Sequence, residues 1–583
     1  MKQFNFRSLG GVILAAVLLS GCASIKKMKK NADKITYDVT PEILESHGGN
    51  VDVAIQGRIP ESYFVKGASV TATPVFVYEG GEQAFKPYSL QGEKVDGNAK
   101  VIPYAKGGSF SYKGTVPFVE GMRKGDLEVR IVASKGAKSV TFDPIKVGEG
   151  TIATSTLVEN TPASIVGIQK SKNTTGVYDP AIDQFQRVVP ESYRADLMYL
   201  INSAYVRGQE LKKEDVAELT KYIKAAYGDE KKELKDIEIS AYASPDGALN
   251  LNEKLAKNRE NSASKYVNRQ LKRNKIDADV TGRFTPEDWE GFKELVEASD
   301  IPDKQLILRV LAMYNDPEVR DREIKNISEA FTVLADKVLP KLRRAKITAS
   351  VDVIGKSDEE ISALATSDAS KLNQAELLYA ATLTEDKNQQ MAIYNAFIKN
   401  YSSDWRGYNN LGMIQMKNGN VDAANKNFKK ADQLDPKNPI VMNNLGAVAL
   451  SNGDVAKAEE LFGAANGAGG EVDYNLGVVA IKKGDYDAAV KYFGKCSCVN
   501  AALAQMLAGD NNGALRTLNN NKSDDALVDY LKAVIGARTA KTTLLYASLR
   551  DAVAKDAKYK ALAKTDLEFA KYIDDAQFKD IVK

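Results

Sequence analysis

The chain has 583 residues, 44% hydrophobic and 27% charged, which is more than one hydrophobic core supports and indicates several domains. Its 80 Lys and Arg side chains nearly balance 77 Asp and Glu, so bulk charge gives no indication of a nucleic-acid-binding protein. The chain has a single histidine, His47, so any Ser-His-Asp or Cys-His site would have to use that one imidazole.

The N-terminus has the organisation of a secretion signal. Lys2 and Arg7 precede a short apolar stretch, residues 9–19, which is too short to span a bilayer as a mature helix. The stretch ends in Leu19-Ser20-Gly21-Cys22, which resembles a lipobox. The resemblance implies that residues 1–21 are a signal peptide and that Cys22 is acylated, with an ordinary signal peptide and an incidental cysteine as the alternative.

Residues 22–35 predict a lipidated, polar tether. Ala23 and Ser24 follow Cys22 where an aspartate would retain a lipoprotein in the inner membrane, so by resemblance to lipoprotein sorting rules we expect the outer membrane. The basic stretch 26–30 differs from the acidic surface-export signals of some lipoproteins, so we expect the periplasmic face. That stretch is interpreted as solvated, with contact to anionic headgroups as the alternative. No later stretch of about 18 apolar residues occurs, so the expected anchor is lipid alone.

From residue 36 to residue 157 the sequence predicts strands. Segments such as VDVAIQGRI (51–59) and LEVRIVAS (127–134) alternate apolar and polar residues or are rich in β-branched residues. Gly-Gly, Asp-Gly and Lys-Gly pairs separate the segments, as expected of turns. The spacing indicates a β-sandwich, immunoglobulin-like in general shape but without the Cys-Trp-Cys signature. Residues 158–192 predict a linker, with the lead-in strand of the next domain as the alternative.

Strands and helices alternate between residues 193 and 355, which predicts a central α/β sandwich. We expect strands at 196–202, 237–243, 277–284 and 345–354, and helices at 212–228 and 250–273. Three segments resemble the OmpA C-terminal domain: Asn202-Ser203-Ala204, the stretch from Ala241 to Arg259, and Lys341–Ala345. The resemblance implies an OmpA-like fold and a Gram-negative periplasm.

Within that resemblance, the loop after residue 243 corresponds to the peptidoglycan-binding segment of the family. There a loop aspartate and a helix arginine bind the diaminopimelate of the peptide stem. The arginine corresponds to Arg259, but the aspartate corresponds to the uncharged Ser244. Asp246 lies two residues further on, so the candidate peptidoglycan-binding residues are Asp246, Asn252 and Arg259. The alternative is a retained fold in which Asn252 and Arg259 brace the loop.

Beyond residue 356 the chain is helical and repetitive. Leu411-Gly412 recurs 34 residues later as Leu445-Gly446, and after a further 31 residues as Leu476-Gly477. Three other positions recur with the same steps: Gly419, Gly453 and Gly484; Ala424, Ala458 and Ala489; Phe428, Phe462 and Phe493. The pattern resembles the tetratricopeptide repeat, which implies an all-α superhelix over 356–583, with degenerate or capping hairpins around three clear units.

In tetratricopeptide arrays the first helix of each unit lines a groove for a partner. The resemblance places eight residues in that groove: Asn409, Met413, Met416, Asn443, Leu450, Tyr474, Val478 and Ile481. Amides mixed with apolar side chains suit an extended or helical peptide, so we expect protein partners. The alternative is that these residues pack against the chain's own α/β domain.

We expect no enzyme activity, no cofactor and no metal site. The HExxH, GxSxG and GxxxxGK[ST] motifs do not occur. Cys496 and Cys498 could pair in an oxidising compartment, but Cys496 falls where Ala431 and Ala465 stand in the repeat. That register predicts a buried packing thiol.

Together these patterns predict a multidomain, periplasm-facing outer-membrane lipoprotein. Its expected parts are an N-terminal β-sandwich, a central OmpA-like domain and a C-terminal tetratricopeptide superhelix. The function hypothesis is an interaction scaffold, as an accessory of an outer-membrane assembly or secretion machine, with envelope proteins bound in the groove. The alternative hypothesis is a peptidoglycan-binding anchor between the outer membrane and the cell wall.

Overall fold

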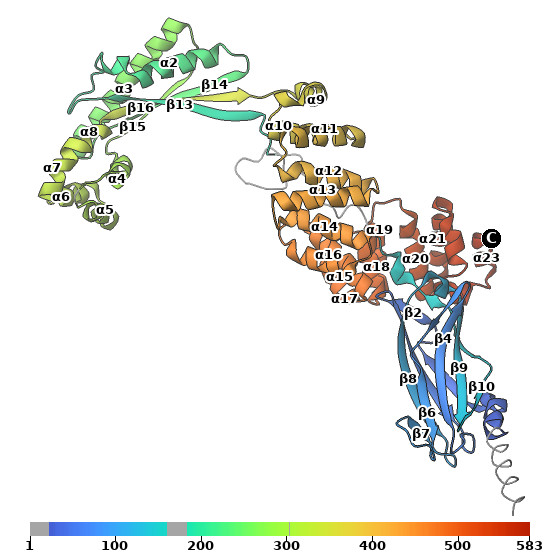
Figure 1. Ribbon diagram of the computed structural model, residues 1–583. Helices are drawn as coiled ribbons and strands as arrows, with labels where there is room; N and C mark the ends of the chain where they lie inside the picture. Colours follow the sequence, from blue (N-terminus) through green and yellow to red (C-terminus); the bar gives the residue numbers. More distant parts are fainter. Residues whose placement is uncertain (1–22, 160–183, 302) are drawn as a thin grey trace, which may run out of the picture. The chain divides into compact units, whose positions relative to one another are not determined.

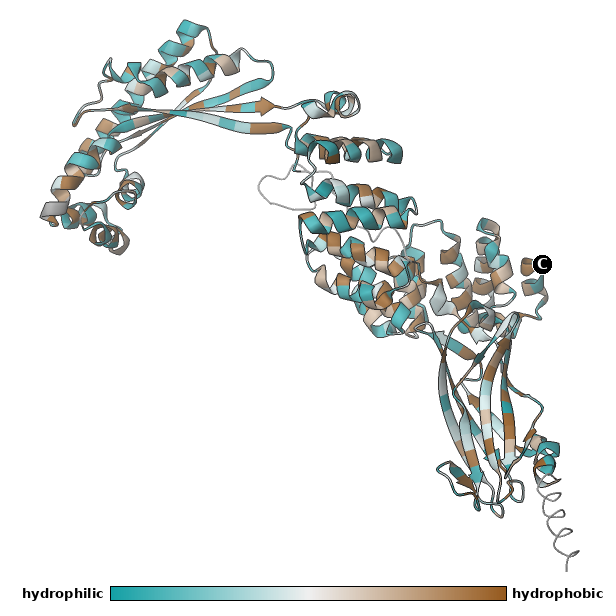
Figure 2. Cartoon of the chain, viewed as in Figure 1, coloured by the Kyte–Doolittle hydropathy of each residue, from teal (hydrophilic) through white to brown (hydrophobic). Residues whose placement is uncertain are grey.

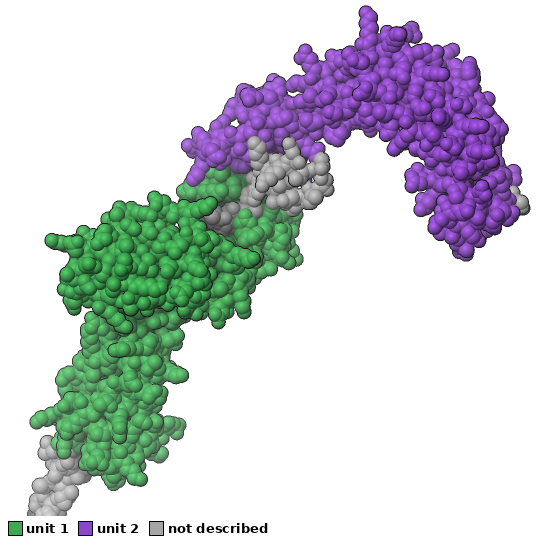
Figure 3. Space-filling model, turned by 180° about the vertical axis from the view of Figure 1, so that it is seen from behind, with its two compact units in different colours: residues 1–168, 401–583 green, residues 169–400 purple. Residues whose placement is uncertain are grey.

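The computed structural model describes residues 23–159, 184–301 and 303–583, without the side chains of 328–330 (Figure 1). The chain divides into two compact units, residues 1–168 with 401–583 and residues 169–400 (Figure 3). Cys22 lies outside the described residues. No described helix is both long enough and apolar enough to cross a bilayer.

Unit 1 begins with two β-sheets that share one hydrophobic core. The first sheet has the order β1-β3-β2-β12, with β8 paired to β3, and the second has the order β10-β9-β4-β6-β7, with β11 and β5 at its sides. The strands are β1 (Thr36–Thr40), β2 (Leu44–His47), β3 (Asn50–Ile59), β4 (Ser69–Tyr78), β5 (Gly81–Ala84), β6 (Tyr88–Gly92), β7 (Lys100–Ile102), β8 (Gly108–Pro117), β9 (Gly125–Lys135), β10 (Lys138–Thr141), β11 (Ile145–Glu149) and β12 (Thr151–Ile152), with the short 3-10 helices η2 (Glu120–Arg123) and η3 (Thr154–Leu157). The predicted strand-rich N-terminal region is confirmed.

Burial alternates along the sandwich strands, as a half-buried sheet requires. In β3, Val51, Val53 and Ile55 are buried while the residues between them face away from the core. Figure 2 shows the same alternation as brown and teal residues along the strands. The two sheets therefore form a sandwich whose interior comes from the in-facing side chains of both.

The segment expected to be a polar tether is instead folded against this sandwich. Residues 23–30 are helical and are followed by the 3-10 helix η1 (Ala32–Lys34). Ile25 and Met28 are buried in the sandwich core, and the Tyr63 hydroxyl donates a hydrogen bond of 2.9 Å to the Met28 carbonyl. Only every third or fourth residue of this basic stretch is apolar, which is enough for one helical face to pack.

Unit 2 contains a four-stranded sheet with the order β13-β16-β14-β15. Its strands are β13 (Val188–Met198), β14 (Lys232–Tyr242), β15 (Val280–Thr285) and β16 (Arg344–Ile354), and its main helices are α2 (Glu214–Tyr227) and α3 (Leu249–Asn274). Strand β16 pairs antiparallel with both β13 and β14, and β15 pairs parallel with β14. The first strand begins at residue 188, inside the expected linker, and ends at 198.

Two groups of helices extend this unit. The insertion between β15 and β16 has its own apolar cluster and contains the helices α4 (Trp289–Glu297), α5 (Lys304–Met313), α6 (Pro317–Lys325), α7 (Ser328–Lys337) and α8 (Leu339–Leu342). After β16 come α9 (Asp358–Ser367), η6 (Ala369–Lys371), α10 (Gln374–Ala380), η7 (Ala381–Leu383) and α11 (Lys387–Asn400). Phe185 stacks on Tyr379 with ring centroids 4.1 Å apart, so these last helices belong to unit 2 although the repeat domain was expected to begin at residue 356.

The rest of unit 1 is helical, as predicted. Its elements are α12 (Trp405–Lys417), α13 (Val421–Leu434), α14 (Pro439–Ser451), α15 (Val455–Ala464), α16 (Gly470–Lys483), α17 (Tyr486–Phe493), α18 (Val499–Leu507), α19 (Asn511–Asn520), α20 (Ala526–Arg538), α21 (Thr542–Lys555), α22 (Lys558–Ala563), η8 (Leu567–Tyr572) and α23 (Ala576–Val582). Consecutive helices pack as hairpins, α12 with α13, α14 with α15 and α16 with α17.

The recurring glycines lie at close helix contacts and at helix ends. A Cβ on Gly412 would lie 2.7 Å from the Phe428 ring, so the first helix approaches the second too closely for any side chain. Gly446 and Gly477 meet the later phenylalanines in the same way. Gly419 has φ +80°, in the left-handed region that ends a helix.

The sandwich and the repeats meet directly within unit 1. A Cβ on Gly48, which has φ +56°, would lie 2.6 Å from the backbone of Lys483 at the end of α16. The adjacent His47 places Nδ1 3.0 Å from the Tyr486 hydroxyl at the start of α17. Unit 1 is therefore one body with the sandwich at one end and the later repeats against it.

The two remaining cysteines are joined by a disulfide, Cys496–Cys498. Cys496 is partly exposed, whereas Ala431 and Ala465 at the equivalent repeat positions are fully buried. The predicted buried packing thiol is therefore wrong. The chain leaves the repeat register after α17, where Gly494 takes φ +54°, so the alignment that placed Cys496 in the joint does not hold there.

Candidate functional site

Six asparagines on the first helices of successive hairpins form what we call the asparagine ladder. They come in sequence from α12, α14, α16 and α18: Asn409, Asn410, Asn443, Asn444, Asn475 and Asn500. All are at most 1% exposed. Buried amides are costly unless they are hydrogen-bonded, so each of these side chains needs partners inside the protein.

The amides connect head to tail from one hairpin to the next. Asn475 Nδ2 donates to Asn443 Oδ1 at 2.8 Å, and Asn443 Nδ2 donates to its neighbour Asn444 at 3.2 Å. Asn444 Nδ2 then donates to Asn409 Oδ1 at 2.8 Å, and Asn409 Nδ2 to Asn410 Oδ1 at 3.1 Å. Asn409, Asn443 and Asn444 each donate and accept within this chain of bonds, which fixes the orientation of these three amides, while Asn475 enters it as a donor and Asn410 as an acceptor.

The last member of the ladder binds a polypeptide backbone. Asn500 Oδ1 accepts from the Glu159 backbone N–H at 3.0 Å, and Asn500 Nδ2 donates to the Glu159 carbonyl at 2.8 Å. The same Nδ2 also donates to the Tyr474 hydroxyl at 2.8 Å. One amide thus pairs with both hydrogen-bonding groups of a single residue, in a segment that reaches the repeats from the sandwich through η3.

Glu159, the residue that Asn500 binds, is itself held against the repeats. Glu159 is half-buried, and burial raises the pKa of its carboxyl above the ordinary value, with Asp525 adding to the effect. The short helix η3 that precedes it packs on α16 and α18. The ladder therefore binds the main chain of the residue, not a charged side chain.

The eight residues expected in the groove have different degrees of exposure. The structure buries six of them: Asn409, Met413, Asn443, Leu450, Val478 and Ile481. Met416 and Tyr474 are partly exposed. The Tyr474 ring also packs edge-on against Phe493, with centroids 5.4 Å apart, so its hydroxyl is held where Asn500 reaches it.

Asn410, Asn444, Asn475 and Asn500 were missed as site residues by sequence reasoning. The signal was present, because an asparagine stands two residues before the helix glycine in Asn410, Asn444 and Asn475 and keeps the steps of 34 and 31 residues. Asn500 follows Asn475 after only 25 residues, because the third hairpin is shorter. The recurrence of asparagine at equivalent positions of the repeats was therefore the signal that could have identified these residues.

The loop of unit 2 places its arginine in the interior. Arg259 on α3 is 1% exposed and donates to three backbone carbonyls: Nε to Ser203 at 3.0 Å, Nη1 to Tyr242 at 2.8 Å and Nη2 to Leu200 at 3.3 Å. Burial lowers the pKa of Arg259 to about 10, and its guanidinium lies 5.3 Å from the Tyr199 ring centroid. The guanidinium fork that would bind a ligand carboxylate is directed at the protein's own backbone.

The other two candidate residues of this loop also have internal partners. Asp246 accepts from Arg343 Nη2 at 3.4 Å, and Arg343 Nε donates to the Ser244 hydroxyl at 3.3 Å. Asn252 is buried, and its Nδ2 donates to the Gly247 carbonyl at 3.2 Å. The structure thus brings Asp246, Asn252 and Arg259 around one loop, with Arg343 as a member that the sequence pattern did not indicate.

Within the part of the chain that the structure describes, no cluster of three or more His, Cys, Asp or Glu side chains is placed to hold a metal ion. The predicted acylation site, Cys22, lies outside that part.

Comparison with protein families identifies the repeats. Residues 415–475 and 474–507 match two models of the tetratricopeptide repeat. The predicted repeats are confirmed over this range. A search of curated proteins finds no match.

Several solved structures are similar to parts of the chain. One is a tetratricopeptide repeat protein from Parabacteroides merdae ATCC 43184, at 14% identity over 36% of this chain and 91% of that one, with a TM-score of 0.29. Another is Pseudomonas aeruginosa pilF, at 14% identity over 39% of this chain and 98% of that one, with a TM-score of 0.26. A third is YrrB, described as having an unusual peptide-binding site, at 15% identity over 32% of this chain and 88% of that one, with a TM-score of 0.21. At these values the similarity adds nothing to what the repeat models establish.

Proposed function

Because residues 415–507 form tetratricopeptide repeats, we propose that the chain is a non-enzymatic scaffold whose asparagine ladder binds the backbone of an extended partner polypeptide. The observation that carries the proposal is the pairing of Asn500 with both the N–H and the C=O of Glu159. Every residue except proline offers these two groups, so such a site accepts extended segments of many sequences.

The backbone bound by Asn500 belongs to the chain itself. A partner segment at this position has to displace Glu159, and the two hydrogen bonds at 3.0 and 2.8 Å set the cost of that displacement. Net hydrogen bonds of this kind contribute about 1 kcal/mol each, so the exchange is within reach of a partner that makes further contacts. The scaffold would therefore bind partners in competition with its own segment.

We place this scaffold on the periplasmic face of the outer membrane, as an accessory of an outer-membrane assembly or secretion machine. The support is the lipobox-like stretch that ends at Cys22 and the absence of an aspartate after it. Acyl chains on one cysteine would hold the protein at the membrane, and co-localisation with weak partners raises their effective concentration to the millimolar range, roughly.

For the central domain we propose an OmpA-like fold used as a dock or spacer. The support is the mixed sheet order β13-β16-β14-β15 together with the loop and helix between residues 243 and 259. Peptidoglycan binding is not part of the proposal, because the Arg259 guanidinium is buried against three backbone carbonyls.

Site-specific photocrosslinking in the full chain tests the scaffold. A photoreactive residue is placed at Met416 or Tyr474, the two partly exposed groove positions, and as a control at Lys429, which is exposed on the second helix α13. We expect adducts with other envelope proteins at Met416 and Tyr474 and none at Lys429. Equal adducts at all three positions, or only self-crosslinked chain at the two groove positions, would overturn the proposal.

The anchor is tested separately by labelling. Cys22→Ser should abolish incorporation of radiolabelled palmitate, and the protein should then leave the membrane fraction. Label that persists in Cys22→Ser would show that this cysteine is not the acylated residue.

A further inference from the structure

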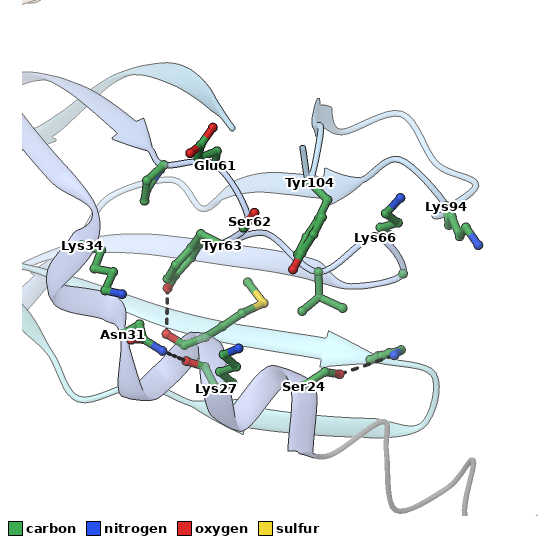
Figure 4. A pocket seen from close by; sticks show the side chains of 15 residues that line it. Ser24, Lys27, Asn31, Lys34, Glu61, Ser62, Tyr63, Lys66, Lys94 and Tyr104 are labelled. Atoms are coloured by element: carbon green, nitrogen blue, oxygen red, sulfur yellow. Dashed lines mark hydrogen bonds between the residues drawn. The ribbon is translucent and has the colours of Figure 1, made fainter. Parts of the chain in front are cut away.

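The sandwich contains a large cavity at the end that faces away from the repeats. Its volume is about 890 Å³, and it lies between the helical segment 23–34 and the loops that join the sandwich strands. Figure 4 shows Lys27 and Lys34 on the N-terminal segment, and Lys66 and Lys94 on the loops on the other side.

Positive charge dominates the lining of this cavity. Five lysines line it, Lys27, Lys34, Lys66, Lys94 and Lys135, against one carboxylate, Glu61. Among the described residues, Lys27, Lys34 and Lys94 have no carboxylate within ion-pair distance, whereas Lys66 is 3.0 Å from Glu93. Clustered ammonium groups in a concave surface produce a potential that attracts anions.

Two tyrosines give the cavity an amphipathic wall. The Tyr63 ring is buried and its hydroxyl is held by the Met28 carbonyl at 2.9 Å, so its position is fixed. Tyr104 comes from the neighbouring loop on the same side, where the Ser62 N–H donates to the Tyr104 carbonyl at 2.7 Å, and Lys66 Nζ lies 5.8 Å from the Tyr104 ring centroid. Tyrosine next to lysine is the composition found at the headgroup level of membranes, where the ring is half-solvated and the cation meets phosphate.

The cavity lies next to the residue that would carry the lipid. Ser24, two positions after Cys22, lines it, and the Ser24 hydroxyl accepts a hydrogen bond from Lys135 Nζ at 3.4 Å. Strand β3 spans ten residues, roughly 33 Å, from Asn50 beside the repeats to Ile59 beside the cavity. The repeats and the cavity therefore occupy opposite ends of unit 1.

We propose that this cavity binds the phosphate of an anionic lipid headgroup. The inference rests on the proposed acylation at Cys22, which would bring the cavity to the membrane surface. Lysine ammonium groups bind the phosphate oxygens while Tyr63 and Tyr104 contact the glycerol and upper acyl region. The bound headgroup fixes the sandwich end of unit 1 at the bilayer and directs the repeats away from it.

Vesicle flotation tests the cavity without the acyl chains. The protein is residues 22–583 with Cys22→Ser, which keeps every described residue, and the vesicles are phosphatidylcholine alone or with phosphatidylglycerol. The cavity variant is Lys34→Gln/Lys66→Gln/Lys94→Gln. The matched control is Lys86→Gln/Lys113→Gln/Lys124→Gln, three exposed lysines of the same domain that do not line the cavity.

We expect binding to the anionic vesicles only, at least about tenfold weaker for the cavity variant and within about twofold of the parent for the control. Each lysine near an anionic surface strengthens membrane binding. The loss of three lysines therefore accounts for a reduction in affinity of this size. Equal losses in both variants, or equal binding to both kinds of vesicle, would overturn the proposal, because general charge attraction would then suffice.

Soluble anions identify the source of the phosphate. Glycerol 3-phosphate and inorganic phosphate are added while hydrogen exchange is followed in the loop of residues 60–67. If these anions slow hydrogen exchange of the loop but the protein does not bind anionic vesicles, the ligand of the cavity is a free phosphate compound. That result would overturn the proposal of a lipid headgroup. Asn500→Ala should leave vesicle binding unchanged, so failure of the scaffold proposal and failure of the cavity give different results.

Discussion

The asparagine ladder of unit 1 and the arginine loop of unit 2 both place buried polar side chains against backbone groups. In the loop, Arg259 donates to three carbonyls of its own domain, two of which lie in the turn between β13 and α2. In the ladder, Asn500 donates to and accepts from one residue, Glu159, which arrives from a different part of unit 1. An arginine has only donors, so it gathers carbonyls and fixes a fold, whereas an amide matches the donor and acceptor of any extended strand.

The largest effect is expected for Arg259→Ala. The carbonyls of Ser203, Tyr242 and Leu200 would lose their donor in the interior, which costs about 3–5 kcal/mol in all since each orphaned acceptor costs about 1–3 and the effects are not additive. The chain has two tryptophans, Trp289 in unit 2 and Trp405 in unit 1. Denaturant unfolding followed by Trp289 fluorescence in a Trp405→Phe background therefore measures the loss.

Arg273→Ala is the control, because Arg273 is exposed on the same helix, α3, and should change the free energy of unfolding by less than about 0.5 kcal/mol. Co-sedimentation with purified peptidoglycan completes the comparison. Clear binding by the parent that is lost in a folded Arg259→Lys protein would contradict the bracing role and return the loop to wall recognition.

A smaller effect is expected for Asn444→Ala in the ladder. The change removes the donor to Asn409 and the acceptor for Asn443, at a cost of about 1–3 kcal/mol. Trp405 fluorescence in a Trp289→Phe background reports on this unit. Asn519→Ala, at an exposed position of α19, should be neutral, and an equal loss in both variants would show that the ladder amides do not act as a network.

The segment bound by Asn500 offers a change that separates main chain from side chain. Glu159→Pro removes the backbone N–H that donates to Asn500 Oδ1, while Glu159→Ala keeps it. Val158 already has φ −59° and ψ 127°, the extended conformation that a residue before proline prefers. We expect a loss of about 1 kcal/mol in the attachment of η3, seen as faster hydrogen exchange at residues 154–158, only in the proline variant.

Binding of a partner should increase in the variant in which the attachment of η3 is weakened. If Glu159 competes with partners, photocrosslinking from Tyr474 should increase several-fold in Glu159→Pro and stay at the parental level in Glu159→Ala. Unchanged crosslinking in the proline variant would separate the Asn500 contact from partner binding.

Much of the fold was predictable because it depends on periodic patterns. The recurring glycines and phenylalanines predicted the helical hairpins, in which Gly412 lies against Phe428. The basic N-terminal stretch was not recognised as a folded helix, because only Ile25 and Met28 bury apolar surface there. Site prediction failed where partners are distant in sequence. Asp246 and Arg343 are 97 positions apart, and Asn500 and Glu159 are 341 positions apart. Neither pairing therefore has a local signature in the sequence.

The smallest effect concerns pH, and it distinguishes the two units because the only histidine of the chain, His47, lies in unit 1. The hydrogen bond to Glu45 raises the pKa of His47 above its ordinary value, with Asp52 adding to the effect, while partial burial and Arg538 oppose it. A raised pKa means that the folded state holds the proton more tightly. The contribution is therefore complete below about pH 6.5 and is lost as the pH rises through the higher folded value.

Because the His47 side chain is 43% exposed, solvent screens this interaction and the effect should be about 1 kcal/mol or less. Hydrogen exchange of residues 44–48 and of α17, corrected for intrinsic rates, should show a joint between sandwich and repeats that is tighter at pH 6 than at pH 8. In His47→Gln the difference should vanish, while the loop of unit 2 should show no imidazole titration in either protein. A pH dependence that persists in His47→Gln would assign the titration to another group and contradict the role of His47.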